Sequence, residues 1–330
     1  MKYKQDPPFS IQVEFTEGCN RGCGFCGIRG IRKTGKQPYY YMTRETATRI
    51  ADEIARVGWN SRIIFAMHGE PTLNKDWLKI IRLFRKKLPE AVLSIMTNGL
   101  AINTEDTEEF EARLHKIRKS GLNDLIIDMY TPNDDGHQIK DMCDRIEQPY
   151  QILGKGVPLY GNSHTKFRVL FNPPIQTEEG AAINRHLCNQ CGAAGHLDFS
   201  YQGKRCARPF REMTFRYDGW VSLCCNDFRG EYPIGNINDR DIDDIWQDKK
   251  FQAARILLYA GDRNSFIPCR GCNALSHRVG LLPDLKGQQE MPEPTDKIKA
   301  YAQRVAAENE PLCGKNWTKR PWEDKENGKD

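Results

Sequence analysis

The segment EGCNRGCGFCGIRG, residues 17–30, places three cysteines in one glycine-rich loop with the spacing C-x3-C-x2-C. It follows SIQVEF, residues 10–15, whose alternating residues predict a β-strand. Three thiolates can bind three irons of a four-iron cluster and leave the fourth iron open to a substrate or cofactor. Zinc would need a fourth ligand, and no histidine lies in this cysteine loop. The loop therefore predicts an iron–sulfur cluster with an open iron.

Short apolar strands alternate with amphipathic helices over the first half of the chain. We expect strands at residues 10–15, 62–67, 91–96, 124–129 and 166–171. A sixth strand is not evident in the pattern. The alternation predicts an α/β fold with a parallel sheet and helical crossovers, in which active sites lie at the carboxyl ends of the strands. The cysteine loop leaves the first strand at that end.

The composition of the chain restricts where the protein is expected to be located and what it is expected to bind. The chain has 330 residues, 12 cysteines and a formal net charge of +5. It contains no run of eighteen apolar residues and no signal-peptide pattern, which favours a cytoplasmic protein without a membrane span. In a reducing compartment, clustered cysteines indicate metal or cluster ligands rather than disulfides. The mild charge, without a basic and aromatic stripe, argues against nucleic-acid binding.

The chain divides into three expected regions. Residues 1–180 are expected to form the strand–helix core, and residues 181–282 a small cysteine-rich domain with little core of its own. Residues 283–330 are polar and charged, which predicts a flexible tail with one helix near 295–308.

The cysteine loop, with Phe25 just before its last cysteine, resembles the signature of the radical S-adenosylmethionine (SAM) superfamily. MHGEPTLN, residues 67–74, follows the second strand where that superfamily has a Gly-Gly-Glu-Pro segment, with His68 in place of the first glycine. The resemblance implies a partial (β/α)6 TIM-like barrel. It also implies a [4Fe–4S] cluster held by Cys19, Cys23 and Cys26.

The resemblance further implies a reaction and its cofactor contacts. In the superfamily, SAM is cleaved reductively on the open iron to methionine and a 5′-deoxyadenosyl radical, which removes a substrate hydrogen. The implied SAM-site residues are Phe25, Gly69, Glu70 and Pro71, the last three through a segment whose backbone holds the methionine amino group.

Two further pairs of residues are candidates for the SAM site. Thr97 and Asn98 either face the cofactor from the third strand or form a tight turn. Asp128 and Arg168, on the fourth and fifth strands, either reach the ribose and carboxylate of SAM or serve a structural ion pair.

A second cysteine group lies between residues 206 and 272. Cys206, the spacing Gly219-x4-Cys224, the PIGNIND turn and the final PCRGC segment resemble a SPASM-type auxiliary-cluster domain. The resemblance implies one auxiliary [4Fe–4S] cluster, with ligands Cys206, Cys224, Cys269 and Cys272. Four thiolates in this arrangement would also suit structural zinc.

The other cysteines have less defined roles. Cys225 is an alternative to Cys224 or a spare thiol, and Cys188 and Cys191 form a further C-x2-C that either supplies a ligand or only forms a bend. Cys143 is expected to be a buried small residue. Cys313 lies in the polar tail, either as a mobile hydrogen donor or without a role.

We therefore predict a radical SAM oxidoreductase or modifying enzyme that acts on a peptide or protein. A small molecule such as an amino sugar or a nucleoside is the alternative substrate, and a non-catalytic iron–sulfur electron-transfer or regulatory protein is the rival class. A reductase such as flavodoxin or ferredoxin is expected as the electron donor. The strand pattern begins at residue 10, which leaves no room before it for a peptide-binding module.

Overall fold

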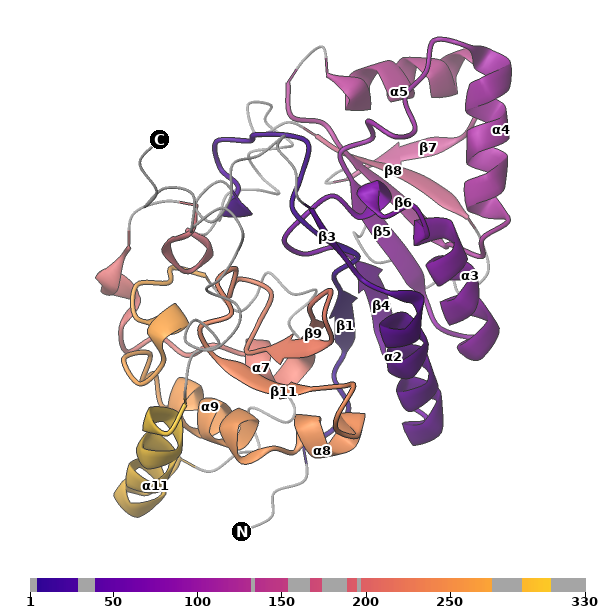
Figure 1. Cartoon of the computed structure of the whole chain (residues 1–330). Helices are drawn as coiled ribbons and strands as arrows, with labels where there is room; N and C mark the ends of the chain where they lie inside the picture. The colour runs from indigo at the N-terminus through magenta and orange to yellow at the C-terminus, as the bar shows by residue number, and fades with distance from the viewer. Residues whose placement is uncertain are drawn as a thin grey trace, which may run out of the picture.

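The computed structural model of the chain describes residues 5–28, 39–131, 134–153, 167–173, 189–194, 197–274 and 293–309. Within them, one sheet of nine strands has the order β11-β10-β9-β1-β4-β5-β6-β8-β7 (Figure 1). A short antiparallel pair lies apart from this sheet, formed by β2 (Thr16–Glu17) and β3 (Tyr40–Tyr41). Of the predicted polar tail, only residues 293–309 belong to the described part.

Six strands between residues 10 and 172 pair in parallel within this sheet. They are β1 (Ser10–Val13), β4 (Arg62–Phe65), β5 (Leu93–Thr97), β6 (Asp124–Asp128), β8 (Arg168–Asn172) and β7 (Tyr150–Ile152). All pairs along this series are parallel. The five expected strands are confirmed. The sixth, β7, escaped prediction because it is a three-residue edge strand whose side chains are only partly buried.

Within the described residues, four α-helices connect these strands. They are α2 (Arg44–Val57), α3 (Trp77–Lys87), α4 (Thr107–Arg118) and α5 (Asp135–Arg145). Helix α2 begins where the Thr43 side chain accepts a hydrogen bond from the Thr46 N–H, and it ends at Gly58 in the left-handed conformation. Its buried face is mainly apolar, and Ile50 and Ile54 stabilise the packing of the helix by about 1.5–3 kcal/mol each.

The cysteine-rich region continues the same sheet. Strand β9 (Glu212–Phe215) pairs in parallel with β1, and β10 (Trp220–Ser222) and β11 (Pro233–Asn236) follow in antiparallel order. Residues of these strands share one hydrophobic core with β1 and β4. The cysteine-rich region therefore has a hydrophobic core, but it shares this core with the parallel sheet.

In the part of the chain that the structure describes, four α-helices complete this side of the molecule. They are α7 (Arg208–Arg211), α8 (Ile242–Trp246), α9 (Lys249–Tyr259) and α11 (Asp296–Ala307). Figure 1 shows α11 beside α9, at the far side of the molecule from α4 and α5. The helix expected near 295–308 is confirmed, and its residues Ala302 and Val305 are buried. Among the helices of the described ranges, none combines the length and the apolar character that crossing a membrane would require.

Candidate functional site

A cavity of about 210 Å³ lies at the carboxyl ends of the parallel strands. Cysteine-loop residues form one wall, and residues that follow β4, β5, β6 and β8 form the others. The cavity brings together most of the predicted SAM-site residues, namely Phe25, Gly69, Glu70, Thr97, Asn98 and Asp128, with the thiols Cys19, Cys23 and Cys26. Pro71 does not line it but begins the buried 3-10 turn Pro71–Leu73 directly behind.

The three loop thiols form an environment suited to a metal cluster. Burial raises the pKa of Cys19, Cys23 and Cys26 to about 11 each, and the neighbouring thiols contribute to this rise. A bound cation would be needed to keep all three as thiolates near neutral pH. Two N–H groups already face one sulfur, because Arg21 N lies 3.3 Å and Asn98 Nδ2 3.6 Å from Cys19 Sγ. Such donors suit a sulfur that ligates iron.

Position 69 requires glycine because its backbone lies directly against the cysteine loop. Gly18 N donates to His68 O at 3.3 Å, and Glu70 N donates to Gly18 O at 3.0 Å. A Cβ atom on Gly69 would lie 2.2 Å from Thr16 O and 2.4 Å from Gly18 O. Any side chain here would push the cysteine loop away, so the glycine has a structural reason independent of the cofactor.

The side chain of Glu70 holds two strand ends together. Its carboxylate accepts hydrogen bonds from Thr72 N at 3.0 Å, Thr72 Oγ1 at 2.6 Å, Thr97 Oγ1 at 2.7 Å and Asn98 N at 2.8 Å. Burial raises the pKa of this carboxyl group. Since four donors from the chain already use it, Glu70 acts by positioning the segments after β4 and β5.

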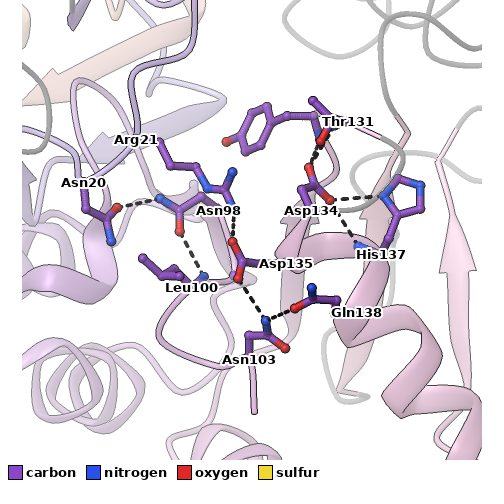
Figure 2. A network of polar contacts seen from close by, with 12 residues as sticks. Asn20, Arg21, Asn98, Leu100, Asn103, Thr131, Asp134, Asp135, His137 and Gln138 are labelled. Carbon is purple, nitrogen blue, oxygen red and sulfur yellow. Dashed lines mark hydrogen bonds and ion pairs between the residues drawn. The ribbon is translucent and has the colours of Figure 1, made fainter. Parts of the chain in front are cut away.

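Asn98 lies both in a turn and on the cavity wall. Its Oδ1 accepts from Leu100 N at 3.0 Å, and its Nδ2 donates to Asn20 Oδ1 at 2.8 Å (Figure 2). Asn98 therefore forms a turn and lines the cavity at the same time, so a tight turn does not exclude a position facing the cofactor. Through Asn20, the turn after β5 also supports the cysteine loop.

A second anchor joins the cysteine loop to α5. Figure 2 shows Arg21 paired with Asp135 in the first turn of that helix, and Asp135 also accepts from Asn103 Nδ2 at 2.9 Å. Asp134 caps the helix, accepting from Thr131 N at 3.0 Å and His137 N at 3.2 Å. Sequence reasoning missed Arg21, because its partner lies more than a hundred residues away along the chain.

Asp128 presents a carboxylate at the end of β6. Its Oδ1 accepts from Asn172 Nδ2 at 2.8 Å and its Oδ2 from Tyr130 Oη at 3.2 Å. Burial raises the pKa of Asp128 to about 6, so the group is mainly ionised at neutral pH. Tyr130 and Asn172 also line the cavity and were missed, although their places at the ends of β6 and β8 would have indicated them.

Arg168 lies away from the cavity, and the prediction that it reaches SAM is wrong. It is the first residue of β8 and pairs in register with Asp124, the first residue of β6. Its Nε and Nη2 atoms both lie 2.8 Å from Asp124 Oδ1. First residues of parallel strands lie at the edge opposite their carboxyl ends. The structural ion pair, the other alternative, is the one that the structure contains.

The second cysteine group gathers into one buried site. Cys206, Cys224, Cys269 and Cys272 are all buried, and Cys269 interacts electrostatically with the other three. The thiol of Cys225 instead contacts Arg208 Nη1 at 2.7 Å. Of the two adjacent cysteines, Cys224 is therefore the one that faces this auxiliary site.

The buried guanidinium group of Arg263 lies beside the auxiliary site. The Arg263 side chain is 1% exposed and donates to Cys272 O at 2.9 Å, Ala274 O at 3.2 Å and Lys204 O at 2.9 Å. Within the described ranges, no carboxylate pairs with it. A buried guanidinium needs a counter-charge, and a cluster with four thiolate ligands carries net negative charge. The site therefore fits an anionic metal–thiolate centre.

His68, which differs from the superfamily pattern, connects the two sites. Its side chain is fully buried, with Nε2 2.9 Å from Cys225 O. Its Nδ1 lies 2.9 Å from Glu14 Oε1 and 3.2 Å from Arg216 Nη1. A glycine at this position would lack all three contacts.

Of the remaining cysteines, Cys143 is buried on α5, as predicted. Cys188 and Cys313 lie outside the described residues. Cys191 is buried and packs with Cys272 and Ala274.

Family comparisons agree with this arrangement of sites. Residues 13–153 match the model of the radical SAM superfamily, and residues 206–273 match that of SPASM, an iron–sulfur cluster-binding domain. The chain therefore belongs to the radical SAM superfamily and carries a SPASM domain. Its cofactors are SAM, the [4Fe–4S] cluster that binds SAM and an auxiliary cluster, and its class is that of an oxidoreductase or modifying enzyme.

Individual relatives cover different shares of the chain. The S-adenosyl-L-methionine-dependent 2-deoxy-scyllo-inosamine dehydrogenase of Niallia circulans is 24% identical over 81% of this chain and 93% of its own length. A probable GTP 3′,8-cyclase of Pyrococcus horikoshii is 30% identical, but over only 34% of either chain. The crystal structure of BtrN in complex with AdoMet and 2-DOIA has the same fold, with a TM-score of 0.62 and 22% identity over 82% of this chain and 95% of that one.

Proposed function

We propose that this chain is a radical SAM dehydrogenase of a small, hydroxyl-bearing molecule. The observation that carries the proposal is the pairing of two unlike thiol sites, one with three thiols open to a cavity and one with four thiols buried. Oxidation of an alcohol removes one hydrogen atom and then one further electron and a proton. A buried, fully ligated cluster suits the acceptance of that electron.

The pairing of the two thiol sites also supports an assignment of the cysteine ligands. Cys19, Cys23 and Cys26 hold the cluster that meets SAM, and Cys206, Cys224, Cys269 and Cys272 hold the auxiliary cluster. When bound, the first cluster supplies the electron that cleaves SAM to methionine and the 5′-deoxyadenosyl radical, which takes hydrogen from the substrate. In sum, SAM and a secondary alcohol give methionine, 5′-deoxyadenosine, the corresponding ketone and a proton.

The cavity residues have binding and positioning roles in this proposal. Asp128 accepts hydrogen bonds from ribose hydroxyls, and the backbone around Gly69 lies beside the methionine end of SAM. Asn98 donates to Cys19 Sγ, and Glu70 holds the walls in place. Phe25 adds an apolar ring to the cavity wall from the cysteine loop. These roles use groups that already line one cavity.

One comparison favours a small molecule over the peptide predicted from the sequence. The Niallia circulans dehydrogenase, named for an inosamine substrate, is similar to this chain over 93% of its own length. A reductase such as flavodoxin or ferredoxin is proposed as the electron donor, in the cytoplasm, where the thiols remain reduced.

The proposal is tested with reconstituted, reduced protein, SAM and a panel of amino sugars and aminocyclitols deuterated at their carbinol carbons. We expect one substrate to transfer deuterium to 5′-deoxyadenosine while an equal amount of ketone forms. The Cys23→Ala variant should form no 5′-deoxyadenosine. Deuterium transfer from a peptide and from none of the panel would reject the substrate class. Loss of SAM cleavage in the parent protein itself would reject the open cluster.

A further inference from the structure

The bend formed by residues 189–194 contacts the cysteine loop through a side chain. Gln190 begins the 3-10 turn of this bend, and its Oε1 atom accepts a hydrogen bond from Gly27 N at 2.5 Å. Gly27 directly follows Cys26, the last thiol of the cysteine loop. The bend therefore holds the loop next to a residue assigned as a ligand of the cluster that binds SAM.

The bend and the cysteine loop are also closely packed around this hydrogen bond. Ala193 of the bend lies in one small buried cluster with Ile28, and Cys26 packs against that cluster. A Cβ atom on Gly27 would lie 2.6 Å from Gln190 Oε1 and 2.9 Å from Ala193 Cβ. The loop therefore lies directly against the bend, without space for a side chain at position 27.

The same bend is joined to the auxiliary site by its preceding residue. Asn189 N donates to Asn273 Oδ1 at 2.6 Å, and Asn273 N donates back to Asn189 Oδ1 at 3.3 Å. Asn189 Nδ2 also donates to Gly271 O at 2.6 Å. Gly271 and Asn273 are the two neighbours of Cys272, which is assigned as an auxiliary ligand. Two adjacent residues, Asn189 and Gln190, thus link the two thiol sites.

The backbone of the bend is strained where the link is made. Gln190 and Cys191 have φ angles of 47° and 56°, in the left-handed region that favours glycine. Residues in this region persist only where their surroundings enforce the conformation, and they cluster at functional sites. A bend that needed only its backbone shape would be formed more favourably with glycine at position 190. The strain therefore indicates that the Gln190 side chain is needed there.

We propose that Gln190 is a positioning residue for the cluster that binds SAM. Its Oε1 atom fixes the peptide group between Cys26 and Gly27, and the position of this peptide group determines where the Cys26 sulfur can lie beside the cavity. SAM must contact both the open iron and the cavity wall, so a displaced ligand weakens its binding. Through Asn189, this position also depends on the last cysteine turn of the auxiliary site. The inference rests on the cysteine-ligand assignment made under the proposed function.

The test uses reconstituted full-length variants. Gln190→Gly removes the acceptor and relieves the positive φ, whereas Gln190→Glu keeps an acceptor oxygen of the same reach. Glu147→Gly is the matched control, because Glu147 also has a positive φ, of 54°, and precedes β7 at the edge of the sheet opposite the cavity. Asn273→Ala removes the acceptor of Asn189 N, and a double variant combines it with Gln190→Gly.

Three quantities are measured anaerobically, which are the iron content, the free energy of unfolding and the equilibrium dissociation constant of SAM without substrate. Gln190→Gly should raise the SAM dissociation constant about fivefold, as loss of one ordinary hydrogen bond would. Its iron should stay at about eight per chain, and its stability should stay near that of the parent, because relief of the strain offsets the lost bond. Gln190→Glu and Glu147→Gly should bind SAM as the parent does.

Asn273→Ala should weaken SAM binding in the same direction. The double variant should bind SAM no more weakly than Gln190→Gly, because both changes release the same bend. Independent, additive effects of the two changes would overturn the link to the auxiliary site.

Three further results would overturn the positioning role. The first is an unchanged SAM dissociation constant in Gln190→Gly. The second is loss of about four irons in that variant, which would make the bond necessary for building the cluster. The third is a large fall in stability that accompanies weaker SAM binding, which would make the bond a general structural one. Failure to oxidise any hydroxyl compound would reject the proposed substrate alone, because SAM binding is measured without substrate.

Discussion

The Nε2 atom of His68 donates a hydrogen bond to the carbonyl oxygen of Cys225 over 2.9 Å. Nε2 must carry the proton, because a carbonyl oxygen only accepts. The ring of Phe228 lies 4.2 Å from that of His68, and His68 is fully buried, so water does not reach the imidazole. This contact joins the segment beside the SAM cavity to the segment that carries Cys224.

Replacing His68 by glycine would restore the residue usual in the superfamily but should destabilise this chain. The variant leaves the Cys225 carbonyl without its donor and opens a cavity at the fully buried position 68, so we expect a loss of about 2–4 kcal/mol in the free energy of unfolding. Anaerobic denaturant titration measures the change. His115→Ala, at an exposed histidine on α4, should stay within about 0.5 kcal/mol of the parent. Equal stability of His68→Gly and the parent would contradict the role given to this contact.

Gly69→Ala should reduce both iron and SAM binding. The new Cβ would collide with backbone oxygens of Thr16 and Gly18, which cannot rotate away, so the cysteine loop must shift. We expect the iron content to fall from about eight toward about four per chain, because the auxiliary site is untouched. Gly235→Ala is the control, since its Cβ would meet chiefly the flexible Arg240 side chain. Normal iron with weakened SAM binding would instead show that the glycine serves the cofactor.

Arg263→Gln should weaken the auxiliary cluster as an electron acceptor. The change keeps a hydrogen-bonding side chain but removes the positive charge beside Cys206, Cys269 and Cys272. A more negative midpoint is expected, because the cation stabilises the reduced cluster. The measurement is a redox titration of the chain that lacks the three loop cysteines, with elemental iron and zinc determined in parallel. One zinc and no iron per chain would show that this site is structural.

Binding of SAM should depend on the ionisation of Asp128. Burial raises the pKa of this group to about 6 in the folded chain, above an unfolded value of about 3.9. The folded state holds the proton more tightly, so the contribution of Asp128 to stability falls as pH rises from about 4 to about 6.

The carboxylate form is the better hydrogen-bond acceptor for ribose hydroxyls. SAM affinity should therefore rise as pH rises through about 6, by roughly fivefold if the charged bond is stronger by about 1 kcal/mol. Equilibrium binding between pH 5 and pH 8 measures this. Asp128→Asn should remove the step, and a step that persists in that variant would assign the titration to another group.

Local patterns predicted much of the fold and of the first site. The apolar runs at residues 10–15 and 62–67 are set by neighbours in the chain, and both strands occur where expected. The position of the cysteine loop after a strand likewise predicted a site at the carboxyl ends of the sheet. Cys206 and Cys272 were grouped through a family resemblance, because their spacing alone does not distinguish iron from zinc.

The sequence by itself determined the class of chemistry. The spacing of the loop thiols, and the strand that precedes them along the chain, are local properties. Only the tertiary structure decided which groups meet. It paired Arg168 with Asp124 at the edge away from the cavity, and it placed His68 against Cys225. It also packed Cys191 against Cys272. The physical reason is that these contacts join segments from 44 to 157 residues apart, whose approach depends on how the whole sheet packs rather than on any local pattern.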